Sequence, residues 1–255
     1  MKRELFPILE FDPEPTAFIN AQDVLKPKDI ARRCVLCFFQ DVLTQLEADG
    51  RFKIITHLGS EIGLAPVYEM EVAGERIAVV HPGVGAPLAG AFLEEMIALG
   101  CRDFIACGGC GVLNGDIGLG HVVVPATAVR DEGTSYHYLP PSREVAAHPE
   151  AVQAVEQALQ KHHVPYVVGK TWTTDAIYRE TPSRIARRRE EGCLVVEMES
   201  AAFFAVAQFR GVRFGQMLYG GDDLTGDAWD SRNWQKESST RARLFQLAVE
   251  AALLL

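Results

Sequence analysis

Hydrophobic positions along the chain follow two alternating patterns. Short apolar or alternating runs predict strands at residues 34–39, 52–56, 67–72, 76–81, 103–107, 122–124, 126–130, 164–172, 193–196 and 213–219. Apolar residues at helical spacing predict helices at residues 41–49, 88–99, 149–162, 181–191, 200–211 and 235–255. Because strands and helices alternate, we expect an α/β fold: a single-domain three-layer αβα sandwich with a mixed, mostly parallel central sheet.

The pattern also suggests where the domain begins. Residues 1–30 contain four prolines and little periodicity, which indicates an irregular N-terminal arm. No repeat or linker divides residues 31–255, so we expect them to form one domain, with a core supported by a hydrophobic content of 48%. No apolar run approaches the ~20 residues of a membrane span, and the N-terminus does not resemble a signal peptide. We therefore expect a cytoplasmic protein.

The net charge and the cysteines limit the kinds of partner and metal site that we expect for this protein. A net charge of −9 disfavours nucleic acid and anionic membranes. The six cysteines include two C-x-x-C pairs, at 34–37 and 107–110, which lie too far apart for a common zinc module. Cys34 and Cys37 are three residues apart in a predicted strand, so their side chains point to opposite faces. We expect buried free thiols in a reducing compartment and no metal site.

The stretch Glu197-Met198-Glu199 places two carboxylates where a buried strand meets a helix. Ligands of open α/β sheets bind beyond the carboxyl ends of strands, so these acids are candidates for binding. An acid at a helix N-terminus also caps the helix and is favoured by its dipole. The spacing alone does not separate these two interpretations.

Other predicted strands also end in residues typical of a site. Two glycine turns, at Gly83 to Gly85 and Gly108 to Gly111, would let the backbone approach a ligand. Asp222 and Asp223 follow the strand at 213–219, and adjacent carboxylates tend to raise one pKa, which suits proton donation. The purely structural alternatives are an ordinary turn for the glycines and a turn or N-cap aspartate for the acids.

Taken in order, these pieces resemble the nucleoside phosphorylase superfamily, over roughly residues 30–255. The motif at residues 196–199 is the most specific element of the resemblance. The resemblance implies that Glu199 accepts the ribose hydroxyls, that Met198 packs on the sugar, and that Glu197 lies in the same pocket. A carboxylate suits two vicinal hydroxyls, and these hydrogen bonds can strengthen as the sugar becomes cationic.

The resemblance also implies roles for the base and the glycine turns. Ile177 and Tyr178 match the segment that supplies base-stacking contacts, and Asp222 matches the acid that protonates the leaving base in purine-specific members. It implies catalytic roles for Asp222 and Glu199. Further positions that it places near ribose or phosphate are Gly83, Gly85, Gly108, Gly109 and Cys110.

The chain departs from this family where phosphorolytic members hold phosphate. Arginines expected near Ala106, after the first strand and near residues 59–66 are missing, which removes the usual charge-assisted grip. Arg130, His137 and Arg179 are candidate replacements for these arginines, and the sequence does not rank them.

The interpretation is a nucleoside phosphorylase-like enzyme that favours purine nucleosides, has no cofactor and uses inorganic phosphate as a possible co-substrate. A phosphate-independent nucleosidase and a non-catalytic nucleoside-binding protein remain alternatives. The resemblance further implies a homo-oligomer, either a dimer or a hexamer.

Overall fold

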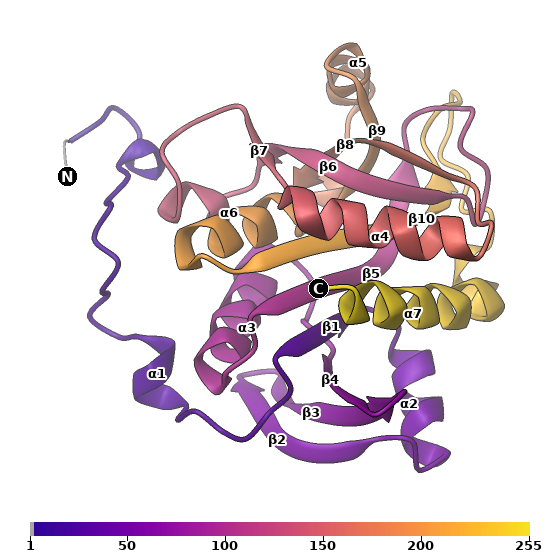
Figure 1. Ribbon diagram of the computed structural model, residues 1–255. Coiled ribbons are helices and arrows are strands. Elements are labelled where there is room, and N and C mark those ends of the chain that lie inside the picture. Colours follow the sequence, from indigo (N-terminus) through magenta and orange to yellow (C-terminus); the bar gives the residue numbers. More distant parts are fainter. Residues whose placement is uncertain (1–2) are drawn as a thin grey trace.

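The computed structural model describes residues 3–255, and one mixed sheet of ten strands organises them (Figure 1). The strands are β1 (Arg33–Cys37), β2 (Lys53–Ser60), β3 (Gly63–Val72), β4 (Glu75–Val80), β5 (Asp103–Val112), β6 (Val122–Asp131), β7 (Glu144–Ala146), β8 (Tyr166–Thr174), β9 (Cys193–Glu197) and β10 (Arg213–Asp223). The α-helices are α1 (Ala21–Val24), α2 (Gln40–Ala48), α3 (Ala86–Leu99), α4 (Pro149–Lys161), α5 (Pro182–Glu190), α6 (Ser200–Arg210) and α7 (Ser238–Leu253). Short 3-10 helices are η1 (Pro7–Leu9), η2 (Thr134–His137), η3 (Ile177–Arg179) and η4 (Trp234–Lys236).

Strand pairing explains how one edge of the sheet becomes a site. β1 pairs in parallel with β4 and β5, and β5 pairs in parallel with β10. β5 also bonds to β9, and β9, β8, β6 and β10 follow one another, so these five strands close on themselves. The carboxyl ends of β1, β5 and β10 therefore lie together. The expected α/β fold with a mixed sheet is confirmed.

Helices cover both faces of the sheet, which confirms the three layers (Figure 1). The core on one face is built with α2, α4 and α7, and the core on the other with α3 and α6. The alternation of β1 shows the division, because Val35 and Cys37 point into the first core while Cys34 and Leu36 point into the second. All six cysteines are buried free thiols.

The structure differs from the expected elements mainly at strand ends. β5 runs on to Val112 and β10 to Asp223, so the glycine segments at 108–111 and 220–221 are strand rather than loop. The backbone pairing of β5 with β10 continues through Gly108, Gly109 and Cys110, and this pairing overrides the low strand preference of glycine. Two elements absent from the expectation, β7 and α1, are only three and four residues long.

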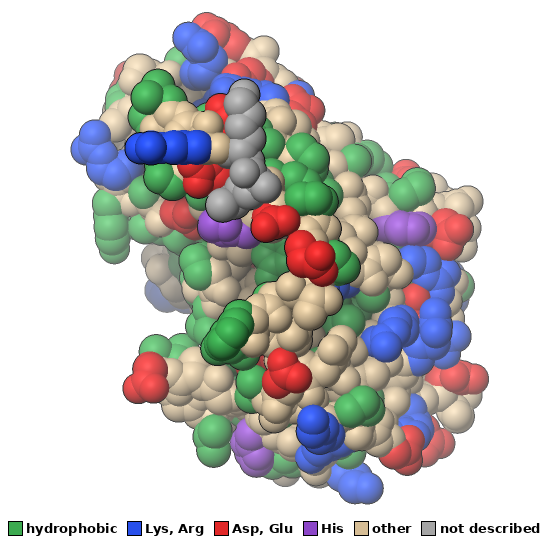
Figure 2. All heavy atoms as spheres, turned by 90° about the vertical axis from the view of Figure 1, so that its left-hand side faces the viewer, with side chains coloured by type: hydrophobic (Ala, Val, Ile, Leu, Met, Phe, Trp, Pro, Cys, Tyr) green, Lys and Arg blue, Asp and Glu red, His purple; other side chains and the backbone are tan. Residues whose placement is uncertain are grey.

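The N-terminal segment crosses one side of the molecule before β1 begins (Figure 1). Residues 1–2 of the expected arm lie outside the described residues. From residue 3 onward the segment contains only η1 and α1, and it leaves Leu5, Phe6 and Phe18 exposed. Figure 2 views this side, with hydrophobic side chains exposed on it. Across residues 3–255, no helix has the length and apolar character needed to cross a bilayer.

Candidate active site

Glu197 caps helix α6 from the end of strand β9. Its Oε2 accepts hydrogen bonds from the backbone N–H groups of Glu199 and Ser200, at 2.7 and 2.6 Å. Its Oε1 accepts from the Thr173 hydroxyl at 2.6 Å. Burial raises the pKa of Glu197, although these hydrogen bonds act in the opposite direction. The capping interpretation of the motif therefore applies to its first acid.

Glu199 is held differently, although it lies only two residues away. Its Oε1 accepts a hydrogen bond of 2.6 Å from the backbone N–H of Gly85, at the start of α3. Gly85 has φ of 89°, a left-handed conformation that favours glycine, so the turn depends on this residue type. Burial, followed by the neighbouring charge of Glu197, raises the pKa of Glu199 to about 8. The glycine turn thus presents a buried, easily protonated carboxyl group.

A cavity of 280 Å³ adjoins this motif, at the carboxyl ends of β5, β9 and β10. Ligands of α/β sheets bind at this kind of edge. The walls combine aromatic, backbone and acidic groups. They are formed by Phe38, Phe39, Val84, residues 108–111, Ile177, Glu180, residues 196–199, Gln216, Leu218, Tyr219, Gly221, Asp222, Trp234 and Arg241.

Asp222 and Asp223 face different surroundings at the end of β10. Asp222 lines the cavity, and its Oδ2 accepts a hydrogen bond of 2.7 Å from the indole Nε1 of Trp229. Asp223 instead pairs with Arg232 and accepts from the backbone N–H of Thr225 at 2.8 Å. Burial opposes the ionisation of Asp223, but Thr225 and Arg232 outweigh it and lower its pKa. Only Asp222 is therefore placed to meet a ligand in this cavity.

Most of the site residues expected from the sequence meet at this cavity. Glu197, Met198, Glu199, Asp222, Ile177, Gly108, Gly109 and Cys110 line it. Gly85 does not line the cavity itself, but its N–H donates a hydrogen bond to Glu199, which does. The N–H of Gly83 instead donates to His81 Nδ1 at 3.0 Å. Tyr178 does not line the cavity, since its side chain is 94% exposed.

The three candidate anion-binding residues lie elsewhere. Arg130 is buried, and its guanidinium donates to Ser135 and Ser142 hydroxyls at 2.9 and 2.7 Å and packs on the Tyr136 ring. Arg179 is exposed and does not line the cavity. These two side chains therefore do not line the cavity.

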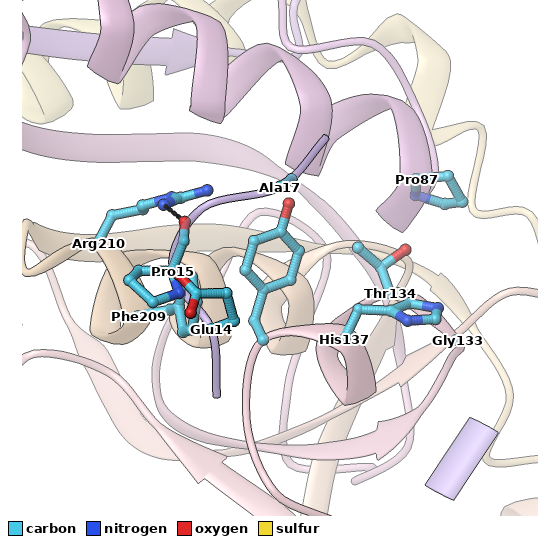
Figure 3. Close-up of a pocket in the computed structure, with 10 residues that line it drawn as sticks. Glu14, Pro15, Ala17, Pro87, Gly133, Thr134, His137, Phe209 and Arg210 are labelled. Atoms are coloured by element: carbon cyan, nitrogen blue, oxygen red, sulfur yellow. Dashed lines mark hydrogen bonds between the residues drawn. The ribbon is translucent and has the colours of Figure 1, made fainter. Parts of the chain in front are cut away.

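His137 lines a second cavity, of 580 Å³, between the N-terminal segment and α6 (Figure 3). In this cavity the Arg210 guanidinium donates to the Pro15 carbonyl at 2.9 Å, which ties the segment to α6 (Figure 3). The same guanidinium contacts both oxygens of Glu94 at 2.9 Å. The positive charge of Arg210 in the second cavity is thus already neutralised by Glu94.

Three polar residues of the first cavity were missed in the sequence. Glu180 follows the Ile177–Tyr178 segment closely and could have been found as an acid beside it. Gln216 is the uncharged polar residue inside an apolar strand; its Oε1 accepts from Ser200 Oγ at 2.7 Å, while its buried Nε2 has no partner within residues 3–255. Arg241 belongs to no recognisable motif, so no sequence pattern pointed to it.

Arg241 reaches the cavity from α7. Its guanidinium lies 5.7 Å from the centre of the Phe39 ring and 5.4 Å from that of Trp234. It also donates to the Tyr219 hydroxyl at 3.3 Å and to Asp41 at 3.2 Å. Among the described residues that line the cavity, the carboxyl groups number four and Arg241 is the one lysine or arginine. Within residues 3–255, no group of three or more His, Cys, Asp or Glu side chains is arranged to hold a metal ion.

Fold and cavity together define an α/β protein with a buried acid pair at a sheet edge, a glycine turn against it and an aromatic wall. Comparison with known proteins gives the family. A sequence model of the Phosphorylase superfamily matches residues 32–253, so the chain belongs to that superfamily.

Individual relatives share between a fifth and a third of their aligned residues with this chain. Guanosine phosphorylase from Halorubrum lacusprofundi is 33% identical over 146 residues, which cover 56% of this chain and 59% of that protein. A DeoD-type purine nucleoside phosphorylase from Colwellia psychrerythraea is 26% identical over 252 residues, covering 94% of this chain and 100% of the relative. The crystal structure of AMP nucleosidase from Bacteroides thetaiotaomicron has the same fold, with a TM-score of 0.74 and 20% identity, over 91% of this chain and 96% of that one.

Proposed function

We propose that this protein cleaves the N-glycosidic bond of a nucleoside, with purine nucleosides favoured. The observation that carries the proposal is that Glu199, fixed on the Gly85 N–H at 2.6 Å, lines the same cavity as Asp222. A sugar-binding acid and a base-facing acid at one cavity suit a bond that lies between sugar and base. The purine preference is supported by Asp222 and by relatives named guanosine phosphorylase and purine nucleoside phosphorylase.

Glu199 binds the ribose in this proposal, and Met198 packs against it. The ionised carboxylate accepts hydrogen bonds from the two vicinal hydroxyls of the sugar. As the glycosidic bond breaks, the sugar gains positive charge, and the negative charge of Glu199 stabilises it more than it stabilises the ground state. Glu197 holds the helix end that positions Glu199.

Asp222 acts on the base. Its Oδ2 is oriented by the Trp229 indole at 2.7 Å, and protonated Asp222 donates to N7 of the departing purine. Ile177 packs on the base from η3, and Tyr178 packs on it only after rotating from its exposed position. Protonation of the base makes it a better leaving group.

The acceptor of the sugar is either phosphate or water. The cavity gives a specific reason to consider water as a second candidate, because its acidic walls repel a phosphate dianion and its Arg241 is shared with Asp41 and Tyr219. The proposed anion-binding roles of Arg130, His137 and Arg179 require these side chains to move, since none of them lines the cavity.

Incubation of the purified protein with guanosine, inosine, adenosine and uridine, with and without phosphate, tests the proposal. Free base with ribose 1-phosphate, formed only when phosphate is present, identifies a phosphorylase. Free base with ribose in either condition identifies a nucleosidase. Release of no base from any nucleoside contradicts the enzymatic proposal.

We also propose a cytoplasmic homo-oligomer, either a dimer or a hexamer. Residues 1–30 form its arm and residues 31–255 its nucleoside phosphorylase-like domain. The apolar side chains of Leu5, Phe6 and Phe18 are exposed, which supports the proposal that a neighbouring subunit covers them. Light scattering after size-exclusion chromatography measures the mass, and a monomer at all concentrations contradicts this assembly.

A further inference from the structure

Gln216 is a buried amide in the wall of the first cavity, and the donor end of this amide is free. The residue is 1% exposed and lines the cavity. Its Oε1 accepts a hydrogen bond of 2.7 Å from Ser200 Oγ, whereas no group within residues 3–255 accepts one from the buried Nε2. A buried donor without an acceptor costs free energy that a paired donor does not. An oxygen of a ligand in the cavity is therefore the partner that suits this Nε2.

The neighbours of Gln216 in the sheet supply no such acceptor. Gln216 pairs across the strands with Ala106 of β5, whose methyl group carries no polar atom. Further along the same two strands, a Cβ added at Gly108 would lie 3.1 Å from the Phe38 ring and 3.5 Å from the side chain of Leu218. This part of the cavity wall is therefore apolar, and Nε2 is the polar group that Gln216 adds to it.

The arginine of the cavity belongs to the other face of β10. Arg241 donates to the Tyr219 hydroxyl, and Tyr219 and Gln216 are three residues apart in one strand, so their side chains point to opposite faces. Tyr219 packs in the core with α7, whereas Phe214, on the same face as Gln216, packs in the core with α3 and α6. Gln216 thus offers a neutral donor, which binds an oxygen whether or not that oxygen is charged.

Gln216 and Asp222 occupy opposite ends of one wall. They are six residues apart on β10, which corresponds to about 20 Å of strand. Asp222 is the acid proposed to protonate the leaving base, and Gln216 contacts Ser200, which directly follows the proposed ribose-binding Glu199. In the proposed complex the ribose lies between Gln216 and the base. A nucleophile that displaces the base directly attacks C1′ from the side away from it, which is the side of Gln216.

We infer that Gln216 Nε2 donates a hydrogen bond to the oxygen that captures C1′, and so holds the acceptor on the side of the sugar away from the base. This inference rests on the proposed function. The C1′–O bond forms as the C1′–N9 bond breaks, and the electron pair of the broken bond leaves with the base, which takes the proton of Asp222 at N7. The acceptor gives up one proton in turn, which restores Asp222 through solvent. Water and hydrogen phosphate both present such an oxygen, and the experiment distinguishes them.

The test compares the wild type with Gln216→Met and Gln216→Leu, and with Gln208→Met as a matched control. Methionine keeps the length of glutamine without its N–H groups. Gln208 is an exposed residue of α6 that does not line the first cavity, and its Nε2 donates to the Ala146 carbonyl at 2.7 Å. We measure kcat and KM for guanosine with and without phosphate. Calorimetry gives the affinity for a C-nucleoside of guanine, whose carbon–carbon bond is not cleaved.

We expect both Gln216 variants to lose about tenfold in kcat without phosphate if water is the acceptor, the worth of one hydrogen bond. If base is released only with phosphate, the KM for phosphate rises by about tenfold instead. Affinity for the C-nucleoside should stay close to that of the wild type, because the nucleoside does not contact Nε2. Gln208→Met should match the wild type in every assay. Melting temperatures close to that of the wild type exclude misfolding as the cause of a loss.

A second measurement detects the contact without turnover. The oxygen of the acceptor becomes O1 of the product sugar, and 1,4-anhydroribitol lacks this oxygen. With guanine present, we expect the wild type to bind ribose about tenfold more tightly than 1,4-anhydroribitol. Gln216→Met should bind the two sugars equally.

The two proposals fail in different ways. Release of no base from any nucleoside contradicts the enzymatic proposal, and the comparison of sugars then decides the inference by itself. Base release that both Gln216 variants retain at the wild-type kcat and phosphate KM overturns the inference and leaves the enzymatic proposal standing. A loss of C-nucleoside affinity as large as the loss of rate, or equal affinity of the wild type for the two sugars, also overturns the inference.

Discussion

At the scale of single residues, two side chains of the same type differ in role because different hydrogen-bond donors and charged groups surround them. Glu197 accepts four protein hydrogen bonds and caps α6, whereas Glu199 accepts one from Gly85 and lines the cavity. Asp222 and Asp223 divide in the same way, since Asp223 is neutralised by Arg232. A helix-capping acid and a second acid, proposed to bind the ligand, thus occur together in one motif.

Replacing Asp222 with Asn tests the proposed proton donor. We expect kcat to fall by about 10²–10⁴-fold, because the amide keeps the shape but does not protonate the leaving base. Guanosine affinity measured without turnover should change little. The matched variant Asp223→Asn loses only an ion pair outside the cavity, so it should retain turnover. Equal losses in the two variants would contradict a special role for Asp222.

The raised pKa of Glu199 predicts a pH dependence of activity. Its pKa is about 8, and only the ionised form accepts from both ribose hydroxyls. We expect kcat/KM for guanosine to rise by up to tenfold per pH unit from pH 6.5 and to level off near pH 8. Glu199→Gln should lower kcat/KM at pH 8 by about 10- to 100-fold, the cost of one charged hydrogen bond. The rate of Glu199→Gln should lack this rise, and an identical pH profile would rule the assignment out.

At the scale of elements, periodicity predicted the strands and helices that carry the cavity, because each buries a regular apolar face. It failed at the ends of β5 and β10, where Gly108 and Gly220 look like turns but are held in pairing with neighbouring strands. Short elements such as β7 gave no signal, because three residues show no periodicity. The residues of the motif and Asp222 line one cavity because each lies at or just after the end of a strong strand.

The turn before α3 can be tested by comparing two glycines. Gly85 and Gly192 have φ of 89° and 82°, and a Cβ added at either meets nothing within 4 Å. Alanine at each position therefore carries backbone strain alone, and we expect both variants to lose about 1–2 kcal/mol of unfolding free energy in urea. Only Gly85→Ala disturbs the N–H that holds Glu199. It should lose at least tenfold in kcat/KM while Gly192→Ala stays close to the wild type; equal activities would show that the turn does not position Glu199.

At the scale of the whole molecule, the cavity depends on contacts between residues far apart in the sequence. Arg241 reaches it from the last helix and meets Phe39 from the first strand's end, about two hundred positions earlier. No local pattern indicates such a meeting, because it follows from how α7 packs across the sheet. The unpartnered amide of Gln216 is equally invisible until strand β10 is placed next to β5. The sequence thus indicated the motif residues that line the cavity, but not the residues that reach it from distant elements.

Buried acids in this cavity also make the stability of the whole protein depend on pH. Glu199 has a folded pKa of about 8 against an ordinary value of 4.5, so between these values the folded state holds a proton that the unfolded state lacks. Stability therefore falls as pH rises through this window. Glu180 acts in the same sense up to about pH 7, more weakly because solvent screens it. His81, whose pKa is lowered by burial, acts in the opposite sense, but only below its ordinary 6.5.

Between pH 6.5 and pH 8.0 the contribution of Glu199 dominates these three. We expect the wild type to lose about 1–2 kcal/mol of unfolding free energy across this range, a fall in Tm of about 3–6 °C. Glu199→Gln should lose much less, and Glu190→Gln should behave as the wild type, because Glu190 is exposed. Scanning calorimetry at matched ionic strength measures the difference. A wild-type Tm that rises over this interval would mean that Glu199 is ionised in the free protein, and the ribose would then bind without release of a proton.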